Sequence, residues 1–306
     1  MFNFIIRRLF WAIAIIFAAM TLTFILTYMI PADPARQVAG PLATELEIAN
    51  VRQNLGLNDP VLVQYSRYFW NIIHGDFGRS WMFRRPVTEA VFGRLPASLQ
   101  LGIAAASVEL ILGGAIGAIS AVYRYKWPDR LSMGIALVAL SLPSFWFGLV
   151  LLFVFGFLIP IFPLGGYGEV KHVVLPALAV GIPYSAWYAR MFRSSIREVM
   201  SEHYVRAVRA KGLSGRVVFL RHILPNALIP IVTMWGMDLG SFVGGLALVE
   251  VVFGWPGVGW QAVEAARSLD VPLVMGSVLL VSALMAFANL AVDISYRWLD
   301  PRVVFD

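Results

Sequence analysis

Four acidic residues lie within or at the edge of long apolar stretches of the chain, namely Glu109, Asp238, Glu250 and Asp293. A carboxylate placed in lipid is costly and therefore marks a functional position by default. If Asp238 lines a solute pathway, it would attract an amine or another cation. We therefore take Asp238, with Glu109 as a second candidate, as the residues of a pathway through a membrane.

The same carboxylates have structural interpretations that the sequence leaves open. Glu250 could bond to the turn at Trp255-Pro256-Gly257, and Glu109 could bond to a neighbouring helix. Asp293 could pair with Arg297, which follows at the spacing of one helical turn.

The sequence lacks the residue patterns of the common kinds of active site. The sequence has no G-x-x-x-x-G-K-[ST] phosphate loop and no G-x-S-x-G turn, and none of its four histidines stands in a metal-binding pattern. It has no cysteine, which excludes disulfides and thiolate metal sites. We therefore predict that the chain is not an enzyme, does not hydrolyse ATP by itself and holds no metal or cofactor.

The composition indicates a membrane protein. Of the 306 residues 59% are hydrophobic and 14% are charged, against roughly 25% charged residues in a typical globular domain. A helix needs about 20 apolar residues to cross a bilayer. We predict an all-α membrane protein with about six transmembrane helices, at Leu9–Ile30, Leu99–Val122, Leu131–Ile159, Val173–Met191, Ala227–Phe253 and Val271–Tyr296. Their glycines and prolines are attributed mainly to close packing of helices.

The basic residues predict the orientation. They gather before the first span at Arg7 and Arg8, and after the second and fourth spans at 124–130 and 190–221. Cytoplasmic loops carry the excess of lysine and arginine, so both termini are predicted to be cytoplasmic. The net charge of +6 is then a topology signal, and nucleic acid is not an expected partner.

The predicted domains are an N-terminal transmembrane helix at 1–30, an extended periplasmic segment at 31–98 and a transmembrane core at 99–300. The first helix is too long for the apolar part of a signal peptide, which favours an uncleaved anchor. The periplasmic segment is richer in aromatic residues than a disordered tail. We expect it to form a small folded cap that lies partly on the membrane surface.

A polar loop at 193–225 separates the fourth and fifth spans. Ser201–Lys211 is predicted to form an amphipathic helix, which Gly212 ends, and a second short helix is predicted at Val217–Leu220. Leu224-Pro225 then leads into the fifth span. A short helix fixed between two spans can pass force from a soluble partner to both; a basic helix lying on anionic headgroups is the alternative.

The segment Tyr204-Val-Arg-Ala-Val-Arg-Ala-Lys-Gly212, followed by Leu224-Pro225, resembles the coupling loop of binding-protein-dependent ABC importer permeases. The family pattern is E-A-A-x-x-x-G with a later L-P. Here Arg206-Ala207-Val208 stands in place of E-A-A, so the glutamate is missing. The chain instead resembles the dipeptide, oligopeptide and nickel branch, in which Y-V-R-x-A-R-A-K-G is typical.

Further motifs similar to that branch occur in order along almost the whole chain. They are Pro31–Ala35, Leu55–Val61, Gly75–Ser80, Arg94–Ser98, Glu250–Gly259, Asn289–Asp293 and Asp300–Arg302. The long segment after the first span resembles the first permease subunit of the pair.

This resemblance implies a permease subunit of an ATP-driven importer in the bacterial inner membrane. It would form the pathway for peptides or related small solutes delivered by a periplasmic binding protein. The implied partners are a second homologous permease, two ATPase subunits that bind ATP and magnesium, and the lipid bilayer. The implied coupling contacts are Tyr204, Ala207, Lys211, Gly212, Leu224 and Pro225.

Two other functions remain as alternatives at this point. A proton-coupled secondary transporter could use Glu109, Asp238 and Asp293 as a relay, although six spans are few and no inverted repeat is found. A membrane scaffold or receptor without transport activity is the other. The branch includes importers of dipeptides, oligopeptides, glutathione and nickel, and peptide is the expected class because it is the commonest.

Overall fold

The structure is a computed structural model that describes residues 2–29 and 32–299. Within these ranges every regular element is a helix, which confirms the all-α prediction. The chain divides into two compact units. Unit one consists of residues 1–98, 243–247 and 256–287, and unit two consists of residues 99–242, 248–255 and 288–306.

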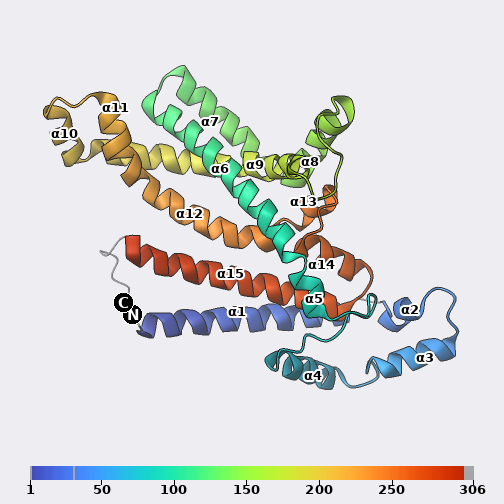
Figure 1. Ribbon diagram of the computed structural model, residues 1–306. Helices are drawn as coiled ribbons and strands as arrows, with labels where there is room; N and C mark the ends of the chain where they lie inside the picture. Colours follow the sequence, from blue (N-terminus) through green and yellow to red (C-terminus); the bar gives the residue numbers. More distant parts are fainter. Residues whose placement is uncertain (1, 30–31, 300–306) are drawn as a thin grey trace. The chain divides into compact units, whose positions relative to one another are not determined.

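Unit one contains the first helix and the short helices that follow it (Figure 1). Its elements are α1 (Phe2–Met29), α2 (Pro34–Ala39), α3 (Glu45–Asn54), α4 (Val61–Ile73), α5 (Val87–Phe92), α14 (Val258–Arg267) and most of α15 (Val271–Leu299). The segment after α1 is thus folded, as predicted. Two of its helices begin at side-chain caps: Asp33 accepts from Ala35 N ahead of α2, and Thr44 and Glu47 form a capping box at α3.

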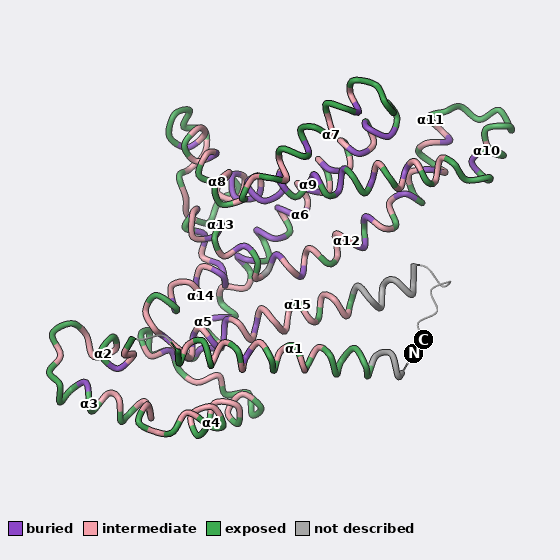
Figure 2. Tube along the Cα trace, turned by 180° about the vertical axis from the view of Figure 1, so that it is seen from behind, coloured by how far each residue is buried: buried purple, intermediate pink, exposed green. Residues whose placement is uncertain are grey.

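Helix α4 packs its aromatic face against α1. The Thr21 and Tyr65 hydroxyls are 2.7 Å apart, and the Phe17 and Phe24 rings make edge contacts with Phe69 and Tyr65. The rest of α1 is largely exposed, as Figure 2 shows by its green and pink tube. An apolar helix that exposes most of its surface is suited to lipid or to another membrane helix.

A buried carboxylate fixes the end of this segment to the turn between α14 and α15. Asp270 is fully buried and accepts from the Ser80 hydroxyl and from the backbone N–H groups of Trp81 and Met82, at 3.1 and 3.2 Å for the two amides. It also accepts from Leu273 N at the start of α15. The apolar residues of α5 pack beside this turn, in one cluster with those of α14 and α15.

Unit two is built around one long helix. Its elements are α6 (Leu95–Val122, from Leu99 on), α7 (Trp127–Leu140), α8 (Ser144–Leu152), η1 (Phe153–Leu158), α9 (Val170–Ser201), α10 (His203–Ala210), α11 (Gly215–Val218), η2 (Phe219–Ile223), α12 (Leu224–Gly245, to Phe242) and α13 (Ala247–Val252, from Leu248). Both α7 and α8 pack along α9, and buried residues recur along its length in Figure 2.

Glycines bring α6 against α9. A Cβ at Gly113 would lie 2.3 Å from the Tyr188 Cβ, and one at Gly117 would lie 2.7 Å from the Ala189 carbonyl oxygen. No side chain fits at either position, so the two backbones approach closely. This agrees with the packing role predicted for these glycines.

The helices long and apolar enough to cross a membrane support most of the predicted spans. Among the described residues they are Ile6–Met29, Val87–Val122, Gly215–Phe242 and Val271–Ala291. The pair Trp127–Leu140 and Ser144–Leu158 is apolar enough as well but is bent by 98°, so it is either a broken span or a re-entrant loop. The predicted third span is therefore not one straight helix, because Pro143 removes a backbone donor at the break.

The predicted fourth span lies inside α9, which does not meet the same criterion of apolarity. With 32 residues the helix is about 48 Å long, which is enough to cross a bilayer. The number of six spans stays a prediction, as does the periplasmic position of residues 31–98. Ile30, the end of the predicted first span, lies outside the described residues.

Candidate functional site

The predicted loop forms a short helix with a turn at one end of unit two (Figure 1). Helix α10 contacts the end of α9 and the following α11. It is shorter than the predicted Ser201–Lys211, because α9 itself continues to Ser201 and Glu202 then adopts extended backbone. The expected amphipathic helix is thus confirmed, and it follows α9 without a linker.

One face of α10 is anchored in the core of unit two. Val205 is fully buried in a cluster with Ile196 of α9, Ile223 of η2 and Ala227 of α12, and Val208 packs against the same cluster. Two valines on eight residues are enough to orient the helix, because they fall on one side at helical spacing.

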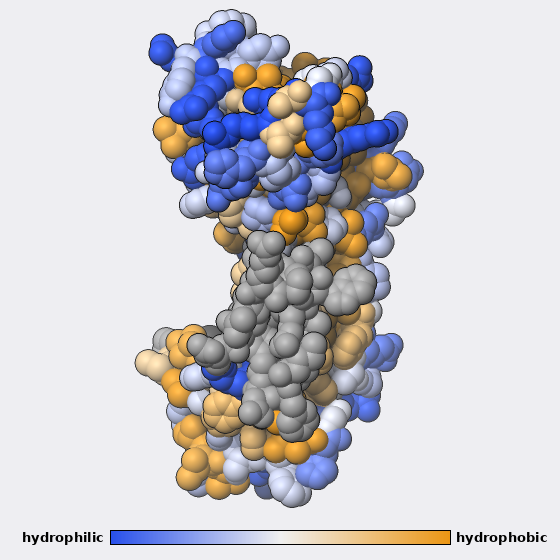
Figure 3. Space-filling view, turned by 90° about the vertical axis from the view of Figure 1, so that its left-hand side faces the viewer, coloured by the Kyte–Doolittle hydropathy of each residue, from blue (hydrophilic) through white to orange (hydrophobic). Residues whose placement is uncertain are grey.

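Most of the remaining surface of α10 is exposed. Of the six residues implied as coupling contacts, Tyr204, Ala207, Lys211, Gly212 and Pro225 are exposed. Leu224 is partly buried and packs against the apolar cluster. Figure 3 shows hydrophilic residues gathered over this end of the molecule. The structure therefore leaves the first five exposed and gives Leu224 an anchoring position.

Gly212 ends the helix in a conformation that other residues rarely adopt. Its φ is +81°, and its N–H donates to the Arg209 carbonyl at 3.0 Å. A Cβ at this position would meet nothing within 4 Å. The requirement for glycine is therefore conformational, as expected for a residue just past a helix end, and space is not the limit.

The chain after Gly212 differs from the prediction. Helix α11 covers Gly215–Val218 where Val217–Leu220 was predicted, and it runs through a π-helical turn, η2, directly into α12. Leu224-Pro225 therefore continues a helix and does not begin one. Pro225 has no N–H to donate, and the wider turn before it accommodates this loss.

Two of the intramembrane acidic residues come together with a tyrosine from a third helix. The Tyr188 hydroxyl of α9 donates to Asp238 Oδ2 of α12 at 2.6 Å. One turn away, Trp235 Nε1 donates to the Ala106 carbonyl of α6 at 3.0 Å, which brings Glu109 to the same level. Glu109 is fully buried, and neither of its carboxyl oxygens has a hydrogen-bond partner among the described residues.

The other two acidic residues are less informative. Glu250 is buried, and its main-chain carbonyl accepts from Trp255 N at 2.8 Å; the bond proposed for its carboxylate stays a prediction. Asp293 and its predicted partner Arg297 lie outside the residues whose side chains are described.

The sequence did not single out Asp129, which the structure makes a centre of contacts. It is 2% exposed and accepts hydrogen bonds from Arg193 and Arg197 of α9 at 2.6 and 3.2 Å. A signal was present: Arg193 and Arg197 are four residues apart, and Asp129 is an acidic residue within a basic turn. The spacing alone does not tell which carboxylate the arginines meet.

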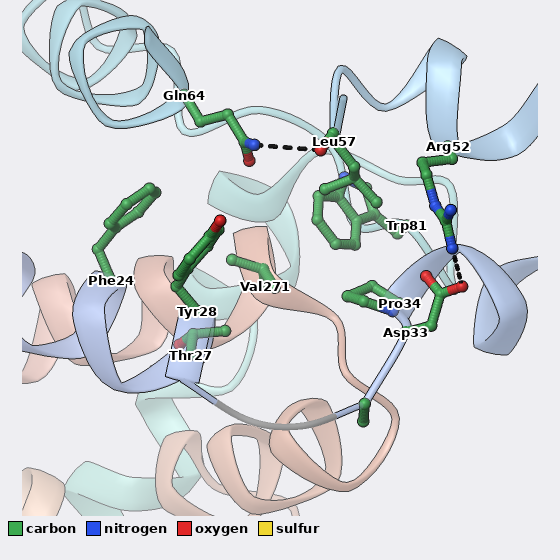
Figure 4. A pocket seen from close by; sticks show the side chains of 11 residues that line it. Phe24, Thr27, Tyr28, Asp33, Pro34, Arg52, Leu57, Gln64, Trp81 and Val271 are labelled. Atoms are coloured by element: carbon green, nitrogen blue, oxygen red, sulfur yellow. Dashed lines mark hydrogen bonds and ion pairs between the residues drawn. The ribbon is translucent and has the colours of Figure 1, made fainter. Parts of the chain in front are cut away.

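A cavity of about 300 Å³ lies in unit one, at the C-terminal end of α1 (Figure 4). It is lined by Phe24, Thr27, Tyr28, Ala32, Asp33, Pro34, Arg52, Leu57, Gln64, Trp81 and Val271. Arg52 is paired with Asp33 at its edge, and Gln64 Nε2 donates to the Leu57 carbonyl at 3.3 Å. This cavity was not predicted. Within the described ranges no group of three or more metal-ligating side chains occurs.

Comparison with known proteins identifies the chain. Residues 113–305 match the family described as "Binding-protein-dependent transport system inner membrane component", and residues 1–102 match the N-terminal part of such membrane components. The glutathione transport system permease protein GsiC of Escherichia coli (strain K12) is 41% identical over 303 residues, covering 99% of both chains. GsiC of Salmonella paratyphi A is 40% identical with the same coverage.

Two solved structures share the fold. An inward-facing form of the MetNI methionine ABC transporter has a TM-score of 0.55 at 17% identity, over 70% of this chain and 97% of that one. An amino acid ABC transporter solved with histidines has a TM-score of 0.53 at 18% identity, over 69% and 94%. The alternative of a proton-coupled secondary transporter finds no support, and ATP hydrolysis belongs to separate subunits. The chain belongs to the binding-protein-dependent transport system inner membrane components and is the permease subunit of an ABC importer, a multi-pass protein of the inner membrane.

Proposed function

We propose that this permease forms one half of a pathway for peptides or related small solutes, with glutathione as the first solute to test. The proposal is supported by two permeases named for glutathione transport, each of which is 41% identical to this chain over 303 residues. A periplasmic binding protein would deliver the solute, and a second homologous permease would complete the pathway.

The exposed face of α10 is the proposed contact for an ATPase subunit. The observation that carries this proposal is the contrast between the buried Val205 and the exposed Tyr204, Ala207 and Lys211 on the same short helix. A helix anchored on one side and open on the other is a surface for a partner. Because its anchor includes residues of both α9 and α12, a push on α10 reaches two long helices at once.

Energy enters such a system when ATP closes the ATPase dimer, with ATP and magnesium held by the partner subunits. Closure moves the permease only to the extent that the ATPases make different contacts with α10 in the two states. In this arrangement both termini and the 193–225 loop face the cytoplasm, and residues 31–98 face the periplasm.

Asp238 is the proposed pathway residue with the strongest support. It is partly exposed, and its carboxylate is oriented by the Tyr188 hydroxyl. A carboxylate held in this way suits the ammonium group of a peptide. Glu109 lies deeper and fully buried, so it would act on the solute only through its neighbours.

The test is to tag this chain, extract it mildly from its native membrane and identify the proteins that co-purify. The expected result is a second permease with one or two ATPase subunits, which a Gly212→Asp variant recovers poorly although it is still inserted. Recovery of the chain alone or as a homo-oligomer, even when ATP hydrolysis is blocked, would contradict the coupling assignment. An attached binding protein would then be screened against glutathione, dipeptides and nickel.

A further inference from the structure

The carboxylate of Asp129 accepts hydrogen bonds from three parts of unit two: α6, the turn that follows it, and α9. One oxygen accepts from the Ser120 hydroxyl of α6. The other accepts from the backbone N–H of Tyr125 at 2.9 Å, from Arg193 Nη2 at 2.6 Å and from Arg197 Nη2 at 3.2 Å. We call these five residues the Asp129 clamp. It ties the turn between α6 and α7 to the last part of α9.

The clamp is a buried ionic group. Asp129 is 2% exposed and Ser120 is fully buried, while the side chains of Arg193 and Arg197 are 26% and 24% exposed. The two arginines lie one turn apart on α9, so both reach the same carboxylate. Removing the carboxylate would leave two partly buried guanidinium groups without their counter-ion, which is costly.

The turn between α6 and α7, just before Asp129, has a conformation that needs outside support. Tyr125 has a φ of +61°, which is uncommon for a bulky residue. Its N–H is held by Asp129, and its ring lies 5.7 Å from the Arg197 guanidinium and 4.6 Å from that of Arg124. The clamp therefore fixes both the entry to α7 and the end of α9.

The clamp lies next to the helix proposed as the ATPase contact. Arg197 is one turn before the end of α9 at Ser201, and α10 begins at His203. Between the two arginines, Ser195 Oγ donates to the Ala227 carbonyl of α12 at 3.0 Å, and Ile196 belongs to the cluster that buries Val205. The same turn of α9 thus contacts α10 and α12 on one side and α7 on the other.

We propose that Asp129 is a positioning residue that makes α7 and α9 move as one body when α10 is displaced. Through it, movement at α10 reaches the start of α7, beyond α9 and α12, whose residues anchor α10. This inference rests on the proposed role of α10 as the coupling helix. Without the clamp, α9 and α12 would still follow α10, but α7 would be held to α9 by apolar packing alone and could shift along it.

The absence of cysteine allows the movement to be measured by spin labelling without first removing native thiols. One pair of labels is placed at Leu137 of α7 and Met191 of α9, which are 60% and 38% exposed. A second pair, at Met191 and the 96% exposed Leu42, reports whether α9 moves relative to unit one. Distances are measured in the complex with its ATPase subunits, with and without a non-hydrolysable ATP analogue.

With the clamp intact, the distribution of Leu137–Met191 distances is expected to be narrow and to keep the same mean with and without nucleotide. The mean Met191–Leu42 distance is expected to change when the nucleotide binds. In Asp129→Asn the Leu137–Met191 distribution is expected to broaden and its mean to change with nucleotide. The number of ATP molecules hydrolysed per solute imported is expected to rise about tenfold, a typical size for coupling between sites. The double variant Asp129→Asn with Arg193→Gln also removes one of the two arginine charges left without a counter-ion. It should restore stability but not the narrow Leu137–Met191 distance distribution. Asp59→Asn, which breaks the exposed pair with Arg67, is the matched control.

Two results would overturn the inference. One is a Leu137–Met191 distance that changes with nucleotide while the clamp is intact, and the other is a distance that stays narrow and unchanged in both Asp129 variants. If the Met191–Leu42 distance never responds to nucleotide, the coupling function of α10 fails instead. The clamp is still tested in that case, because the width of the Leu137–Met191 distance distribution without nucleotide can be compared between the variants.

Discussion

The Tyr204 hydroxyl of α10 donates a hydrogen bond to the main-chain carbonyl of His222, 3.0 Å away in the π-helical turn before α12. The same carbonyl accepts from Asn226 Nδ2 at 2.8 Å. Burial raises the pKa of the Tyr204 hydroxyl above its ordinary value, and the Glu202 carboxylate acts in the same direction. The hydroxyl therefore remains a donor at neutral pH. It joins the proposed coupling helix to the entry of α12.

Replacing Tyr204 by phenylalanine removes this bond and leaves the ring. A loss of about 0.5–1 kcal/mol of local stability is expected, because one partly exposed hydrogen bond is worth about that much. The measurable result is a severalfold drop in solute imported per ATP at an unchanged level of protein in the membrane. Tyr167→Phe, which keeps the ring contact with Trp255, is the control. Equal coupling ratios for the two variants would remove Tyr204 from the coupling surface.

Gly212 should tolerate no branched or charged replacement. Gly212→Asp and Gly212→Pro are expected to abolish transport while membrane insertion stays intact, because Gly212 lies in the polar loop and not in an apolar helix. Gly212→Ala is expected to cost about 1–2 kcal/mol through its left-handed backbone. The control is Gly215→Ala, which stands in the same loop at the start of α11 and meets nothing within 4 Å. Normal uptake by Gly212→Asp would refute the coupling assignment.

Asp238→Asn tests the pathway. If the carboxylate receives an ammonium group, its loss should lower uptake about tenfold, as for a charged hydrogen bond worth about 1.5 kcal/mol. For a solute that carries no amine, uptake by Asp238→Asn and by the unaltered protein should be equal. Tyr188→Phe removes only the orienting hydroxyl and is expected to have a smaller effect in the same direction. Uptake and preference that do not change in Asp238→Asn would leave the residue with a structural role alone.

Asp270→Ala should destabilise unit one without touching the proposed coupling surface. The change leaves the N–H groups of Trp81 and Met82 and the Ser80 hydroxyl without their acceptor, at a cost of about 3 kcal/mol. It would be seen as a lower midpoint of thermal unfolding of the solubilised protein. Glu264→Gln, which breaks the exposed pair with Arg267, should change stability by less than about 1 kcal/mol. Equal midpoints for the two variants would contradict the anchoring role of Asp270.

The features that the sequence predicted well are those that depend on near neighbours in the chain. Composition and apolar runs indicate helices in a membrane, and a spaced glycine indicates the end of α10 at Gly212. The prediction of element boundaries was wrong where a local sequence signal has more than one structural outcome. Leu224-Pro225 looked like a helix start, but the helix already runs from Gly215 and accommodates the proline with a π turn.

The sequence by itself determined the class of protein, the family motifs and the location of the exposed segment that we propose for coupling. The tertiary structure decided which distant groups meet: Asp129 with two arginines of α9, Tyr188 with Asp238, and Tyr204 with the His222 carbonyl. The reason is physical. Periodicity and hydropathy are properties of a segment, whereas a hydrogen bond or an ion pair exists only after particular helix faces have packed together, and glycines such as Gly113 determine how closely they do so.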